Sequence, residues 1–179
     1  IGIVVHAVLE RLARTALPTD ATAFVAVQAP FWRREAERHA LADGQRLSAP
    51  VAARLGAEIA RQVRGVLADP QGRRLLEARS DAYAEFALTV ALEGTTDNLV
   101  VDRTFVEDGR RWVVDYKTSI PPPETDVEAF LEAEVARYRL QLERYGDAVE
   151  ALFGDRPDLA IYFTALPRLK VLRGRPPHP

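Results

Sequence analysis

The sequence contains no cysteine, and this absence removes several kinds of site at once. Disulfides, zinc–thiolate sites, iron–sulfur clusters and cysteine nucleophiles all need a thiol. Only three histidines are present, too few for a metal site built mainly of imidazoles. No apolar run approaches the roughly 20 residues that cross a bilayer, and residues 1–5 lack the basic region and cleavage site of a signal peptide. We therefore expect a cytoplasmic protein without a membrane partner.

Methionine is missing too, even at position 1, where isoleucine stands. We interpret the chain as a fragment of a longer polypeptide, although its 179 residues are enough for one domain with a hydrophobic core. The formal net charge of -2 excludes a strongly basic surface, so a nucleic-acid partner needs a local basic patch. The phosphate-binding pattern G-x-x-x-x-G-K-[ST] does not occur, so any ATP hydrolysis belongs to sequence outside this chain.

The hydrophobic pattern changes period along the chain. Over the first 80 residues, apolar side chains recur at helical spacing, as in Val51, Leu55 and Ile59. Residues 83–118 instead form three β-rich runs, and the last two flank the turn pair Asp108-Gly109. We predict three successive antiparallel strands there.

After these strands comes a proline-containing loop, followed by residues 126–153, whose apolar stripe predicts a long helix, and a strand over residues 158–166. We expect one α/β domain over residues 1–179, mainly helical to residue 80, with a core at residues 81–175. Its sheet is expected to be mixed, with helices flanking it.

Two acidic positions interrupt the apolar strands. Side chains alternate along a strand, so Asp115 and Lys117 are expected on one face, with Asp102 on the adjoining strand. Nearby carboxylates repel unless a cation lies between them, and carboxylate oxygens suit Mg²⁺ or Mn²⁺. A plain alternative is a solvated salt bridge on a strand.

Four segments together resemble the nuclease domain of the RecB and AddA family, which is of the PD-(D/E)XK type. They are residues 2–10 with the Gly-x-x-x-His spacing of Gly2 and His6, Glu85-Phe86, Val101 to Arg103 with Val114 to Thr118, and residues 138–145 with the form Tyr-x-x-Gln-Leu-x-x-Tyr. The family usually has a glycine shortly before its first aspartate. Here Asn98 and Leu99 stand four and three residues before Asp102, so that glycine is absent. Iron–sulfur-bracing cysteines of AddB-like relatives are absent, which favours the AddA or RecB side.

The resemblance implies a restriction-endonuclease-like core and a set of site residues. His6, Asp102 and Asp115 would bind Mg²⁺ or Mn²⁺, and Lys117 would be the catalytic lysine. Glu85 would be a supporting acidic residue. Taken alone, His6 and Glu85 also fit a core histidine and a solvent-facing strand residue.

Residues of the long helix and the second strand are further candidates. Gln141 and Tyr145 share one helix face and would reach the site or the DNA backbone. A DNA-contacting surface is expected from five side chains, namely Arg103, Lys117, Arg137, Gln141 and Arg144. The helix also carries interleaved glutamates, so a charge-balanced solvated face is an equal reading of its arginines.

The function implied is a metal-dependent nuclease that cuts single-stranded or unwound DNA ends during double-strand break repair and recombination. Such domains lie at the C-terminal end of UvrD-type helicases, so helicase domains of the same polypeptide and a RecC- or AddB-like subunit are the expected partners. One alternative is a catalytically inactive nuclease fold that binds DNA or docks a subunit. Another is an unrelated α/β domain with a salt-bridged strand.

Overall fold

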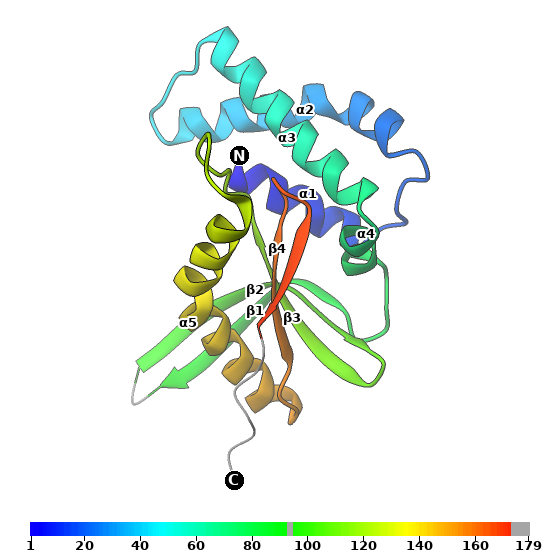
Figure 1. Cartoon of the computed structure of the whole chain (residues 1–179), viewed down its shortest axis with the longest axis vertical. Helices are drawn as coiled ribbons and strands as arrows, with labels where there is room; N and C mark the ends of the chain where they lie inside the picture. The colour runs from blue at the N-terminus through cyan, green and yellow to red at the C-terminus, as the bar shows by residue number, and fades with distance from the viewer. Residues whose placement is uncertain (93–94, 173–179) are drawn as a thin grey trace. The chain divides into compact units, whose positions relative to one another are not determined.

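The computed structural model describes residues 1–92 and 95–172, with only the backbone described for residues 90–92 and 95–97 (Figure 1). The chain divides into two compact units. The first comprises Ile1–Glu77, Lys117–Ser119 and Phe163–Arg168. The second comprises Ala78–Tyr116, Ile120–Tyr162 and the part of the chain from Leu169.

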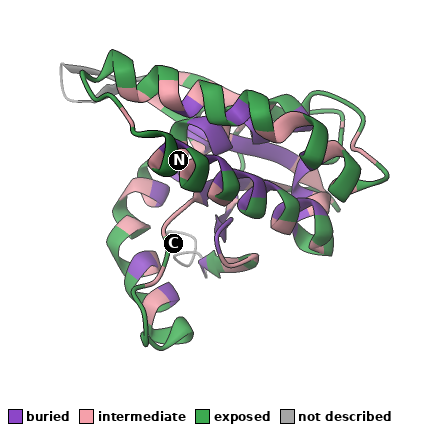
Figure 2. Ribbon diagram, turned by 90° about the horizontal axis from the view of Figure 1, so that it is seen from above, coloured by how far each residue is buried: buried purple, intermediate pink, exposed green. Residues whose placement is uncertain are grey.

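Four helices make up most of the first unit: α1 (Gly2–Ala13), α2 (Ala21–Ala42), α3 (Ala49–Ala68) and α4 (Pro70–Leu76). Two begin at aspartate caps: Asp20 accepts from the Ala23 N–H at 2.9 Å, and Asp69 from the Gly72 N–H at 3.0 Å. Each of the three longer helices buries one side and exposes the other, the pattern expected of amphipathic helices (Figure 2).

The sheet has five strands in the order β1-β2-β3-β4-β5. They are β1 (Tyr83–Leu92), β2 (Thr95–Glu107), β3 (Arg110–Lys117), β4 (Asp158–Phe163) and β5 (Arg168–Leu172). β1 pairs with β2 and β2 with β3, both antiparallel, and the whole sheet is mixed. The predicted α/β fold with three antiparallel strands over residues 83–118 is therefore confirmed.

Local sequence signals set the connections of this sheet. Asp108 and Gly109 both have positive φ, 49° and 74°, as a two-residue hairpin loop of the primed type requires. Helix α5 (Val127–Phe153) begins where Asp126 accepts from the Ala129 N–H at 2.8 Å and ends at Gly154, whose φ is 90°. β4 ends at Phe163, three residues before the predicted boundary, because a turn follows it.

None of the helices in the described part of the chain is both long and apolar enough to span a bilayer.

Candidate functional site

The ends of β2 and β3 bring two acidic residues to neighbouring positions. The ladder between these strands ends at the pair Arg103 and Val114, so Asp102 and Asp115 are the next residues along the two strands. The Oδ2 atom of Asp102 accepts a hydrogen bond from the backbone N–H of Tyr116 at 2.7 Å. The side chain of Asp102 therefore reaches across to β3 directly after Asp115.

Glu85 faces Asp102 from the other neighbouring strand. The register of β1 with β2 passes from Ala84–Arg103 to Phe86–Val101, which leaves Glu85 opposite Asp102. A carboxylate oxygen of Glu85 lies within 4.8 Å of one of Asp102. Two half-buried carboxylates at this separation repel each other, and a divalent cation that prefers oxygen ligands removes the repulsion. The donor set therefore fits Mg²⁺ or Mn²⁺.

The backbone at Glu85 is unusual as well. Its φ is +49°, a left-handed conformation that few residues other than glycine adopt within a strand. A conformation of this kind costs on the order of 1–3 kcal/mol and persists where the surrounding structure enforces it, often at functional sites. The strained backbone is thus at Glu85, one of the two residues that form the carboxylate pair.

The segment Asp115 to Lys117 combines a buried carboxylate with a half-buried amine. Asp115 is 3% exposed, and as residues two apart on β3 it and Lys117 have side chains on the same face of the strand. Tyr116 points to the opposite face and is also 3% exposed. Burial raises the pKa of the Tyr116 phenol above its ordinary value, and the charge of Asp102 adds to this against the opposing effect of Arg103.

On helix α5, Gln141 and Tyr145 form a hydrogen-bonded pair. The Gln141 amide donates to the Tyr145 hydroxyl at 2.6 Å, as their four-residue spacing allows. The Tyr145 ring is 8% exposed, whereas Gln141 is half-buried. The two predicted residues are thus brought together.

His6 is half-buried on α1, one residue after the fully buried Val5. It belongs to the first unit, whereas Glu85 and Asp102 belong to the second. Its role as a metal ligand stays a prediction.

A model of the PD-(D/E)XK nuclease superfamily matches residues 1–173. The chain belongs to this superfamily. The segment Asp115-Tyr116-Lys117 has the D-x-K form of the superfamily's name, and Asp102 is the preceding strand aspartate. PD-(D/E)XK nucleases use divalent metals, in agreement with the chemistry of the carboxylate pair. No curated protein matches the chain.

The predicted DNA-contacting arginines of this PD-(D/E)XK domain differ in exposure. Arg103 is 1% exposed, its guanidinium lies 5.7 Å from the Phe105 ring centre, and burial lowers its pKa. A phosphate contact needs an accessible guanidinium, which the burial of Arg103 does not provide, so its contact with DNA stays a prediction without structural support. Arg137 and Arg144 are exposed on α5, and Arg137 lies 3.5 Å from Glu134.

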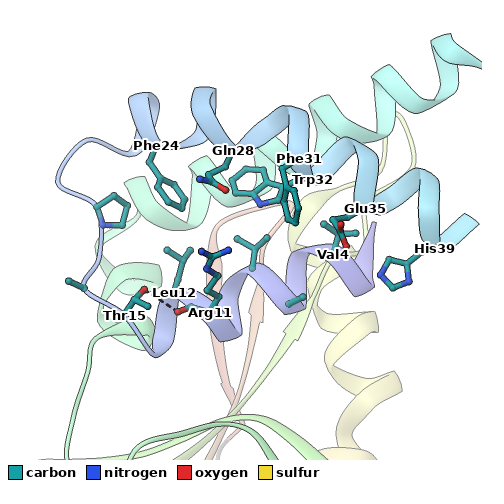
Figure 3. Close-up of a pocket in the computed structure, with 14 residues that line it drawn as sticks. Val4, Arg11, Leu12, Thr15, Phe24, Gln28, Phe31, Trp32, Glu35 and His39 are labelled. Atoms are coloured by element: carbon teal, nitrogen blue, oxygen red, sulfur yellow. Dashed lines mark hydrogen bonds between the residues drawn. The ribbon is translucent and has the colours of Figure 1, made fainter.

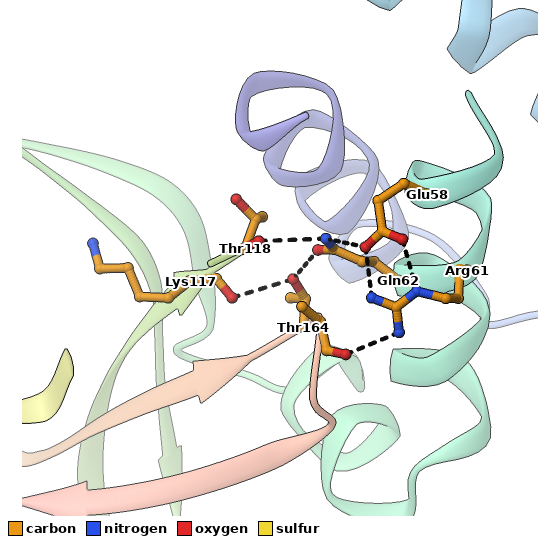
Figure 4. A network of polar contacts seen from close by, with 7 residues as sticks. Glu58, Arg61, Gln62, Lys117, Thr118 and Thr164 are labelled. Carbon is orange, nitrogen blue, oxygen red and sulfur yellow. Dashed lines mark hydrogen bonds and ion pairs between the residues drawn. The ribbon is translucent and has the colours of Figure 1, made fainter. Parts of the chain in front are cut away.

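Sequence reasoning missed a buried polar network within the first unit of the PD-(D/E)XK domain, centred on Gln62 of α3 and Thr164, which follows β4 (Figure 4). Both side chains are 0% exposed. One signal was available: Gln62 interrupts the apolar stripe of α3 between Ile59 and Val63, a position where a polar side chain needs a buried partner.

A cavity of about 390 Å³ lies between α1 and α2 of the PD-(D/E)XK domain. Figure 3 shows Phe24 and Trp32 of α2 turned toward α1, where Val4 and Leu12 line the other side. No predicted metal-binding or catalytic residue belongs to its lining among the residues that the structure describes.

Proposed function

We propose that this PD-(D/E)XK domain is a divalent-metal-dependent deoxyribonuclease that hydrolyses phosphodiester bonds. The observation that carries the proposal is the approach of the Glu85 and Asp102 carboxylates to within 4.8 Å, next to the strand that presents Asp115 and Lys117. Membership of a nuclease superfamily over residues 1–173 supports it.

The proposed metal ligands are Asp102, Asp115 and His6, with Glu85 as a supporting acidic residue close to Asp102. The oxygen-rich set suits Mg²⁺, with Mn²⁺ as its closest substitute. A divalent ion held there would supply positive charge to the scissile phosphate and lower the pKa of a bound water.

Lys117 is proposed to act on the scissile phosphate. Its ammonium shares a strand face with Asp115, so it can place positive charge where negative charge develops on the phosphate oxygens. The three donor hydrogens of an ammonium also allow Lys117 to orient the attacking water while it contacts an oxygen.

Helix α5 is proposed to hold the DNA backbone. Gln141 is half-buried and fixed by its bond to Tyr145, so its orientation is set before DNA binds. Arg137 and Arg144 have exposed side chains and would contact phosphates without reading sequence.

We further propose that the domain works in a helicase-nuclease of the RecB or AddA type. The four segments that resemble this family span residues 2–145, most of the chain. In this setting the substrate is single-stranded or unwound DNA at a break, and ATP is used by helicase domains of the same polypeptide. A RecC- or AddB-like subunit is the expected partner.

The direct test is cleavage of linear single-stranded and duplex DNA with Mg²⁺, Mn²⁺ or EDTA. We expect metal-dependent cleavage by the wild type, lowered at least about 100-fold in Asp115→Asn and in Lys117→Ala. Lys170→Ala is the matched control, because Lys170 is the other lysine of the chain and forms an ion pair with Glu128 on the protein surface. Cleavage that persists in EDTA, or that is equal in all four proteins, contradicts the proposal.

A further inference from the structure

One residue, Thr164, which follows β4, holds the backbone carbonyl of Lys117. The Thr164 N–H donates to the Lys117 carbonyl oxygen at 2.9 Å, and the Thr164 hydroxyl lies 3.2 Å from the same oxygen. Figure 4 shows the carbonyl of Lys117 turned toward Thr164 while its side chain extends away from the network. The end of β3 is therefore fixed on one side, and the amine is directed to the other.

Gln62 completes the contact from helix α3. Its Oε1 accepts from the Thr164 hydroxyl, while its Nε2 lies 3.4 Å from the Thr118 carbonyl oxygen and 2.9 Å from a Glu58 carboxylate oxygen. A fully buried amide is costly unless its donors and acceptor are satisfied, and here all have partners. Gln62 thus links two consecutive carbonyls, those of Lys117 (through Thr164) and Thr118, to α3.

A charged pair on the same helix braces this arrangement. Arg61 donates to Glu58 at 2.7 Å through Nε and to the Ala165 carbonyl at 2.9 Å through Nη1. The hydrogen bond from Arg61 lowers the pKa of Glu58, so the carboxylate that accepts from Gln62 is charged at neutral pH. Side chains from about one turn of α3 are therefore hydrogen-bonded to the chain at residues 118, 164 and 165.

These contacts reach the chain where β3 ends. Lys117 is the last residue of β3, and a loop with three consecutive prolines, residues 121–123, follows shortly after it. Proline has no N–H to donate, so that loop has fewer backbone hydrogen bonds with which to hold the strand end. The hydrogen bonds to the Lys117 and Thr118 carbonyls hold the end of β3 instead.

We propose that Gln62 and Thr164 are positioning residues that fix the Lys117 amine at the reaction site. This inference rests on the function proposed for Lys117. Misplacing a reacting group by about 1 Å can cost on the order of 100-fold in rate, so side chains that hold the backbone next to Lys117 can control turnover. Purely apolar packing would hold α3 against the chain equally well but would offer no hydrogen bond to the Thr164 hydroxyl or the Thr118 carbonyl.

The test compares Thr164→Val with Thr164→Ser. Valine has nearly the shape of threonine and keeps the backbone N–H, but it removes the hydroxyl; serine keeps the hydroxyl. We expect Thr164→Val to lower kcat about 10-fold while KM and Mn²⁺ affinity stay at wild-type values, because the carboxylates are untouched. Thr164→Ser is expected to keep wild-type kcat.

A second readout does not depend on activity. The chain has only two lysines, Lys117 and Lys170, so methylation with ¹³C gives two lysine signals in NMR spectra, assignable with Lys170→Arg. In Thr164→Val we expect the Lys117 signal to move, with both signals unchanged in Thr164→Ser. The Lys170 signal serves as the internal control, because its amine pairs with Glu128 outside the network.

The outcomes separate the two proposals. An unmoved Lys117 signal with wild-type kcat in Thr164→Val overturns the positioning role. A fall in kcat that only follows the folded fraction, with the Lys117 signal unmoved, also overturns it. A wild type that cleaves no DNA, together with a shifted Lys117 signal in Thr164→Val, overturns the proposed function but supports the contact between the network and Lys117.

Discussion

The carboxylate of Asp102 accepts a hydrogen bond from the backbone N–H of Tyr116, with 2.7 Å between Oδ2 and N. Asp102 of β2 is thus hydrogen-bonded to β3 at Tyr116, the residue between Asp115 and Lys117. Asp102 has two separable properties in this position, its negative charge and its ability to accept this hydrogen bond. Each of them is expected to serve a different purpose, metal binding and strand geometry.

The first prediction separates these properties with Asp102→Asn and Asp102→Ala. Asparagine keeps an oxygen that can accept from Tyr116 but lacks the charge, so we expect cleavage to fall at least about 100-fold with little change in stability. Alanine removes both, so the free energy of unfolding is expected to fall by about 1–2 kcal/mol as well. Cleavage assays and urea unfolding measure the two effects. Wild-type cleavage by Asp102→Asn would show that the charge has no catalytic role.

The second prediction concerns Glu85→Gln. Removing one of two neighbouring negative charges relieves their repulsion in the metal-free protein, so its melting temperature in EDTA should equal or exceed that of the wild type. The same change weakens the attraction for a cation, and we expect Mn²⁺ affinity to fall about 10-fold. Calorimetric titration with Mn²⁺ and thermal melting in EDTA are the measurements. Unchanged Mn²⁺ affinity would place the metal away from Glu85.

The third prediction concerns the Gln141–Tyr145 pair. Tyr145→Phe keeps the buried ring but removes the hydroxyl that accepts from Gln141, so Gln141 is no longer held in one orientation. We expect KM for DNA to rise about 3- to 10-fold, the effect of one lost hydrogen bond, and the free energy of unfolding to fall by no more than about 1 kcal/mol. Tyr83→Phe is the control, because Tyr83 is exposed on β1. A similar rise in KM in both variants would argue against a specific role for the pair.

The fourth prediction is a pH dependence of stability. Hydrogen bonding from Arg61 holds the pKa of Glu58 below its ordinary value of 4.5, so the folded state favours the charged carboxylate more than the unfolded state does. This contribution is fully present above the unfolded pKa and is lost as the pH falls through the lower folded pKa. We therefore expect Glu58→Gln to lower unfolding free energy at pH 7 but to have less effect at pH 3.

Urea unfolding at both pH values measures this difference. Glu37→Gln is a suitable control, because Glu37 pairs with Arg33 at the surface of α2, at 3.7 Å. An equal loss in Glu58→Gln at pH 7 and pH 3 would show that the charge of Glu58 contributes nothing to stability.

Short-range signals in the sequence were sufficient for several features. The alternation of side chains along a strand places Asp115 and Lys117 on one face, and Asp108-Gly109 predicts the hairpin that makes β2 and β3 neighbours. Covalent geometry and local backbone preferences decide these features, and both act over a few residues. The same holds for the start of α5 at Asp126.

Three features were decided by tertiary structure. The register of β1 on β2 sets Glu85 opposite Asp102, 17 positions away in sequence. Tertiary packing buries Arg103 in the interior. It also brings Gln62 next to Thr164, which lies 102 positions later in the sequence.

The sequence by itself therefore determined which residues are candidates for the chemistry and that Asp115 and Lys117 share one strand face. Only the tertiary structure decided which carboxylate meets Asp102 and what holds the carbonyl of Lys117. The physical reason is that strand register and buried hydrogen bonds depend on how distant segments pack together, and periodicity along one segment carries no information about its partner.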